Sequence, residues 1–70
     1  MKTINDQGYE WIEVNKNILN YLCLHSEGQK VKSEILSHMD DDEMLSFEEY
    51  MNELLNGSTH SKFYKLRKIQ

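Results

Sequence analysis

One apolar stripe with helical spacing, between residues 46 and 57, constrains the fold of this chain more than any other feature. Its five apolar residues occupy relative positions 0, 3, 4, 7 and 8, so a single face of a helix would bury them all. They are Phe47, Tyr50, Met51, Leu54 and Leu55. Ser46 and Glu49 have the spacing of a capping box, and Asn56-Gly57 is a common helix end. We therefore predict a helix between Ser46 and Asn56.

Two more helices are expected before this stripe. Residues three or four apart predict a first helix over about residues 9–25, and they are Trp11, Val14, Ile18, Leu22 and His25. Ser26-Glu27-Gly28 would end it, because Gly28 readily takes positive φ. Val31, Ile35 and Met39 repeat every four residues and predict a short second helix over about 30–39.

Both ends of the chain also fit strands. The sequence YEWIEV alternates in the way an edge strand does, and a helix would then begin at Asn15 or Asn17. KFYKLRKI suits a terminal strand. As a helix, the terminal segment would be capped by Ser58 or Thr59 and would place Phe63, Leu66 and Ile69 three apart. We favour an all-α fold of three to four short helices in a helix-turn-helix-like bundle. The fallback is a winged-helix-like α+β fold with short strands near 9–14 and 62–69.

The chain has 70 residues, which is enough for one domain. We expect a flexible N-terminal segment over 1–8 and a single small helical domain over 9–70. The single cysteine, Cys23, excludes an intramolecular disulfide and suits a reducing, cytoplasmic location. The apolar runs are far shorter than the roughly 20 residues that a membrane span needs, so no membrane partner is expected. A homodimer would be a natural way to cover leftover apolar surface.

Catalysis and metal binding find little support in the sequence. Cys23 and His25, two residues apart on a helix, project about 200° from each other and would not meet as nucleophile and base. The histidines lie in three separate segments without the spacing of a zinc site, and no glycine-rich phosphate loop is present. We therefore predict a protein that is not an enzyme, with no catalytic residue, cofactor site or metal site.

The acidic run DDDEMLSFEEY resembles the end of an EF-hand calcium loop. If Glu49 takes position 12 of such a loop, Ser46 takes position 9. The match fails at position 1, where His38 offers nitrogen to a hard cation, and at position 6, where Glu43 replaces the required glycine. Acidic residues that stabilise the start of a helix explain the run more simply. A degenerate EF-hand-like calcium-binding protein is therefore the least favoured of three functions.

The second function rests on the uneven placement of charge. The net charge is −4, but residues 58–70 hold four basic residues and no acidic one. A helix, a short glycine-containing turn and a basic helix have the layout of a helix-turn-helix, which predicts a DNA-binding transcriptional regulator. The candidate DNA contacts are Ser58, Thr59, His60, Ser61, Lys62, Lys65, Arg67 and Lys68.

The favoured function is that of a small non-enzymatic regulatory protein that binds a partner protein through an acidic and aromatic helical surface. The acidic bulk of the chain repels DNA, and aromatic residues often dominate the energy of protein interfaces. In size and charge the chain is similar to small acidic proteins of phages and mobile elements. The candidate interface residues are Trp11, Asp40, Asp41, Asp42, Glu43, Glu48 and Tyr64.

Overall fold

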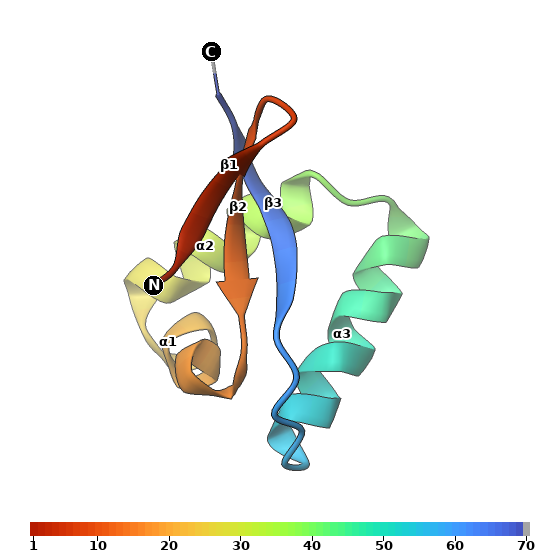
Figure 1. The fold of residues 1–70 in the computed structure, drawn as a ribbon. Helices are drawn as coiled ribbons and strands as arrows, with labels where there is room; N and C mark the ends of the chain where they lie inside the picture. The colour runs from red at the N-terminus through yellow and green to blue at the C-terminus, as the bar shows by residue number, and fades with distance from the viewer. Residues whose placement is uncertain (70) are drawn as a thin grey trace.

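The computed structural model describes residues 1–69 and has an α+β fold (Figure 1). In this part of the chain a three-stranded antiparallel sheet carries helices on one face. The predicted all-α bundle is therefore wrong, whereas the fallback strands near 9–14 and 62–69 are close to those found. No helix-turn-helix forms within residues 1–69, because residues 62–68 are a strand and not a second helix.

The sheet begins with a hairpin. β1 (Thr3–Asp6) pairs antiparallel with β2 (Tyr9–Val14). Gln7 and Gly8 join them with φ values of 54° and 81°, and positive φ at both central residues is what a type I′ turn requires. The right-handed twist of such a turn matches that of the strands it connects. β1 lies within the segment 1–8 that we expected to be flexible.

β3 (Lys62–Lys68) comes from the far end of the chain and pairs antiparallel with β2, which gives the order β1-β2-β3. Glu10 pairs with Arg67 and Trp11 with Lys65, so Leu66 is the extra residue of a β-bulge. The bulge lets two consecutive residues turn towards the helices. Leu66 is buried in the core, and Arg67 bonds to a carboxylate of a helix.

The first helical segment after β2 starts later than predicted. A 3₁₀ turn, η1 (Lys16–Ile18), is capped by the side chain of Asn15 and leads into α1 (Leu19–Leu24). The predicted helix over 9–25 is therefore wrong in its first half. The segment YEWIEV forms a strand, as its alternation indicates, and not a helix. The reason is that β2 lies between two partner strands and buries Ile12 and Val14 on the helix side.

Gly28 has a different role from the one predicted. It lies in the first turn of α2 (Ser26–Ser37) and does not follow the end of a helix. The second helix therefore both starts and ends earlier than the predicted range of 30–39. A Cβ atom built on Gly28 would stand 1.7 Å from the carbonyl oxygen of Tyr21 in α1. The absence of a side chain therefore lets α1 and α2 approach each other closely.

The apolar stripe lies on α3 (Asp41–Leu55), which confirms a helix at this position. Its cap is not the predicted pair of Ser46 and Glu49. Asp40 is the N-cap residue, and it forms a capping box in which its carboxylate accepts from the backbone of Glu43 at 2.8 Å. The acidic residues that follow occupy the first turn, where they favour the helix dipole.

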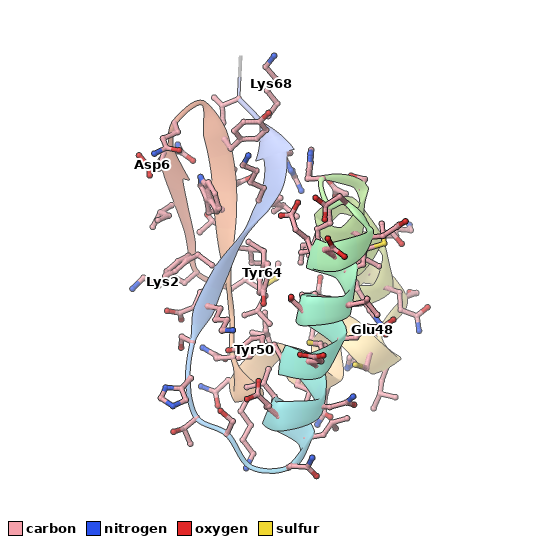
Figure 2. All side chains as sticks on the ribbon, turned by 90° about the vertical axis from the view of Figure 1, so that its right-hand side faces the viewer. Lys2, Asp6, Glu48, Tyr50, Tyr64 and Lys68 are labelled. Carbon is pink, nitrogen blue, oxygen red and sulfur yellow. The ribbon has the colours of Figure 1, made fainter. Side chains whose placement is uncertain are left out.

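A single apolar core lies between the sheet and the helices. It comprises Ile12, Val14, Leu19, Leu22, Ile35, Phe47, Tyr50, Met51, Leu54 and Leu66. Figure 2 shows the sheet on the left and α3 on the right, with Tyr50 and Tyr64 between them and Lys2 and Asp6 pointing away from the helices. The outer face of the sheet is left open, and both β1 and β3 are edge strands in the described chain.

Candidate interaction surface

A groove runs between β3, the connection from α2 to α3, and the first turns of α3. Two hollows of about 330 and 350 Å³ form it, and both are lined by Met39, Glu43 and Tyr64. We call it the β3–α3 groove. Each hollow lies near the lower end of the volume range of small-ligand pockets, so a side chain of a partner would fit there.

The groove brings together four of the seven predicted interface residues. Trp11 lines the first hollow, Asp42 lines the second, and Glu43 and Tyr64 line both. The sequence alone could not show that these residues lie close together, because they belong to three different elements. The strand pairing of β2 with β3 and the packing of α3 against them produce the cluster.

The ring of Tyr64 forms one wall of the groove and is held in place by contacts with two other rings. It meets the buried ring of Phe47 edge to face, with centroids 4.9 Å apart, and the ring of Tyr50 at 6.1 Å. Offset and edge-to-face contacts of this kind are favourable beyond the area they bury. Tyr50 is fixed in turn, since its hydroxyl lies within hydrogen-bonding distance of the backbone carbonyls of Val14 and His60.

An aromatic and cationic cluster continues from the groove around the edge of β3. The ammonium group of Lys65 lies 4.5 Å from the ring centroid of Tyr9 and 5.6 Å from that of Trp11. The Tyr9 ring also meets His38 edge to face at 6.0 Å. His38 Nε2 lies 2.9 Å from the carbonyl oxygen of Leu66, which ties the end of α2 to the bulge.

The remaining predicted interface residues divide between two places. Asp40 and Asp41 stand beside the groove at the start of α3, and both are exposed. Glu48 projects from α3 away from the sheet (Figure 2) and lines a separate hollow towards α1. The structure therefore concentrates acidic charge at one end of the groove and leaves Glu48 apart from it.

The predicted DNA contacts are not gathered on one face. Ser58, Thr59, His60 and Ser61 lie in the loop between α3 and β3, and the basic residues follow on β3. Arg67 bonds to Glu10 at 3.4 Å and to Glu34 at 3.2 Å. The ammonium group of Lys62 lies 4.8 Å from the ring centroid of Tyr50, on the helix side of the sheet, whereas Lys65 contacts the rings of the outer face. Lys68 ends the strand.

The EF-hand arrangement does not form. Ser46 and Glu49, which would be loop ligands, are both inside α3. Across residues 1–69 no three His, Cys, Asp or Glu side chains come together as metal ligands. None of the helices in the same range has the length and apolar content to cross a bilayer.

Sequence reasoning missed several residues of the groove. His38 and Met39 lie in the connection from α2 to α3, and Phe63 lies on β3. Lys65, also on β3, was predicted as a DNA contact and not as part of a protein interface. The alternation in KFYKLRKI was the available signal for β3, since it places Phe63 and Lys65 on one face of a strand. Met39, which was expected to continue the repeat of Val31 and Ile35 on a helix, lies beyond the end of α2 at Ser37.

No protein-family model matches the chain, and neither the curated proteins nor the solved structures give a match. Inference about function therefore rests on the groove and on the two sheet edges.

Alkaline pH gives a test of how firmly Tyr64 is held. Burial, and then the negative charges of Tyr50 and Glu53, raise the pKa of Tyr64 to about 12. Tyrosine in an unfolded chain ionises near pH 10. Between about pH 10 and 12 the unfolded state therefore binds fewer protons than the folded state, and the free energy of unfolding falls as pH rises. Below about pH 10 the phenol is neutral in both states and adds no pH dependence.

We expect Tyr64→Phe to flatten this alkaline loss of stability and to remove the latest phase of a phenol titration followed at 295 nm. Urea denaturation at several pH values between 9 and about 12 measures the slope. Part of the slope remains, because burial also raises the pKa of Tyr50. Equal slopes for Tyr64→Phe and the natural protein would contradict the expected burial of the Tyr64 ring.

Proposed function

We propose that this chain is a small non-enzymatic regulatory protein that binds a partner protein through the β3–α3 groove. The observation that carries the proposal is the convergence of Trp11, Asp42, Glu43 and Tyr64 on two adjoining hollows. Hollows with aromatic walls suit the anchor side chains that dominate protein interfaces. The proposal places the protein in the cytoplasm, where the free thiol of Cys23 would stay reduced.

Charge on the α3 side of the groove indicates the chemistry of the partner, whereas Lys62 and Lys65 line the β3 side. Asp41 and Asp42 have no ion pair within the described residues and stand exposed at the end of the groove. A basic side chain of a partner next to an apolar anchor would match this end. The acidic residues then raise the association rate and reject acidic partners, which is the usual contribution of charge at the rim of an interface.

Binding of nucleic acid through Lys62, Lys65, Arg67 and Lys68 remains the alternative function. The placement of these residues favours it less than their grouping in the sequence does. Arg67 is already held by two carboxylates, and Lys62 and Lys65 contact rings on opposite faces of the sheet. Phosphate binding needs cations that can approach one backbone together.

Site-specific photocrosslinking tests the proposal. A photoreactive amino acid at Asp42, which lines the groove, should capture a defined partner from an extract of the source cell. The same amino acid at Lys30, exposed on α2 outside the groove, is the matched control and should not capture that partner. Equal capture from both positions, or capture of nucleic acid alone, would contradict a protein site in the groove.

Charge reversal then measures the contribution of the acidic end. Asp41→Lys with Asp42→Lys should weaken binding of the captured partner at least tenfold, about 1.4 kcal/mol. Glu27→Lys with Glu48→Lys makes the same change of net charge away from the groove and should change the affinity less than twofold. Circular dichroism checks that both proteins fold. A salt series with random duplex DNA tests the alternative, which requires binding that falls steeply with salt and disappears when the four basic residues of β3 become alanine.

A further inference from the structure

The outer edge of β1 is uncovered along its whole length. All residues of Thr3–Asp6 are exposed, including Thr3 and Asn5, whose side chains are on the same face of the sheet as the core residue Ile12. The helix layer therefore does not extend over β1. Of the features that protect such an edge in natural proteins, β1 has no proline, bulge or covering segment in residues 1–69. It does have a short length of four residues and the charges of Lys2 and Asp6.

The pairing with β2 determines which backbone groups of β1 are free. The carbonyl oxygen of Lys2 accepts a hydrogen bond from the N–H of Glu13 at 2.9 Å, so Lys2 and Glu13 form a hydrogen-bonded pair. Because such pairs alternate along an antiparallel ladder, the N–H and C=O groups of Ile4 and Asp6 also point to β2. The N–H and C=O groups of Thr3 and Asn5 point outward, away from the sheet.

The sequence of this edge is complementary to itself. In an antiparallel pair of two β1 strands centred on Ile4, Thr3 lies opposite Asn5 of the second copy, and their outward groups form the hydrogen-bonded pairs. In the same register Lys2 lies opposite Asp6 of the second copy, on the outer face where Figure 2 shows both side chains. Ile4, which is 42% exposed, meets Ile4 of the second copy. Cross-strand pairs of opposite charge and of apolar residues both stabilise a sheet.

Other registers lose this agreement. Only Thr3 and Asn5 have outward N–H and C=O groups, so each must lie opposite Thr3 or Asn5 of the second copy. The alternative registers, Thr3 opposite Thr3 or Asn5 opposite Asn5, therefore shift the pairing by two residues. A shift in one direction brings Ile4 opposite Lys2, and a shift in the other brings Ile4 opposite Asp6. Both break the pairs of opposite charge and separate the two isoleucines.

We propose that two copies of this chain pair through their β1 edges, in the register centred on Ile4, and form a continuous six-stranded antiparallel sheet. The pairing has two-fold symmetry, in which each copy contributes the same surface. It leaves the β3–α3 groove of each copy free, because β3 is at the opposite edge of the sheet. The dimer therefore does not depend on the proposed function, and either can fail without the other.

Sedimentation equilibrium between 10 μM and 1 mM tests the pairing, together with two charge variants. Asp6→Lys sets two lysines against each other, and Lys2→Glu sets a glutamate against Asp6. Each variant alone should dimerise at least tenfold more weakly than the natural protein. A mixture of the two variants should form a heterodimer of near-natural affinity, since both cross-strand pairs then have opposite charge. Asn20→Lys adds the same kind of charge on α1 and should leave the dimer unchanged.

Amide hydrogen exchange gives an independent measurement. Protection of the Thr3 and Asn5 N–H groups should rise with protein concentration, whereas the N–H of Ile4, which is bonded to β2, should change little. Asn5→Pro removes an outward donor without removing a bond to β2, and it should weaken the dimer. A protein that stays monomeric at 1 mM, a dimer that none of the β1 changes weakens, or a mixture of charge variants that fails to associate would each overturn the proposal.

Discussion

Gly28→Ala should destabilise the protein by more than about 3 kcal/mol, because there is no room for a Cβ atom where α1 and α2 meet. The added atom would stand 1.7 Å from the carbonyl oxygen of Tyr21 and 2.4 Å from its carbonyl carbon. Both are backbone atoms, so the helices themselves must separate. A domain of this size has a total stability of about 4–10 kcal/mol, and a large part of it would be lost.

Urea denaturation followed by circular dichroism measures this effect. Ser33→Ala is the matched control, since Ser33 is exposed on the same helix, and its effect should stay within about 0.5 kcal/mol. If Gly28→Ala unfolds within about 1 kcal/mol of the natural protein, the close approach of α1 and α2 is wrong.

Phe47→Ala should cost about 3–5 kcal/mol, the usual range for a large buried aromatic side chain. Phe47 has no exposed surface, and it supports Tyr64 through an edge-to-face contact at 4.9 Å. The change leaves a cavity directly behind a wall of the groove. The variant should therefore lose partner binding as well as stability.

Thermal and urea unfolding of three proteins separate burial from helix propensity. Leu55→Ala removes an apolar side chain that is 66% exposed on the same helix, and it should change stability by less than about 0.5 kcal/mol. Phe47→Leu keeps most of the volume and should fall between the two. Equal effects of Phe47→Ala and Leu55→Ala would show that α3 does not pack on the sheet as described.

The sequence predicted α3, the helix with the strongest local pattern, but it did not predict the residue at which this helix begins. Four of the five stripe residues, from Phe47 to Leu54, are buried on one face, so local periodicity was sufficient to predict the helix. Leu55, which was expected to be buried with them, is 66% exposed. Two capping boxes compete at the start of α3, one from Ser46 to Glu49 and one from Asp40 to Glu43. The earlier one forms because it adds more than one turn of helix, with acidic residues at the favourable end.

The strands could not be chosen over helices from local sequence alone. Trp11, Val14 and Ile18 satisfy helical spacing even though the first two lie in β2 and the third lies in a 3₁₀ turn. The deciding contact pairs Trp11 with Lys65, which is more than fifty positions along the chain. β1 was harder still, because it holds one apolar residue and is exposed throughout. Its strand structure comes from the turn at Gln7 and Gly8 and from pairing with β2.

The groove could not be predicted from local sequence either, because it is formed by residues that are distant along the chain. The predicted interface residues Trp11, Asp42 and Tyr64 line two adjoining hollows only because β3 lies between β2 and α3. Composition had suggested aromatic and acidic residues as binding groups, but it could not separate Glu48 from the others. The direction in which α3 presents each side chain makes that separation.

The two layers of the fold carry opposite charge, and this gives the molecule a permanent electric dipole. The segments 1–14 and 62–69, which contain the sheet, hold five basic and three acidic residues, whereas residues 15–61 hold three basic and nine acidic ones. In a crowded cell a polyanion would meet the sheet side first, and a cationic protein would be drawn to the helical side. The electric field of a charged partner thus orients the molecule before contact, and this long-range orientation precedes any recognition by individual side chains.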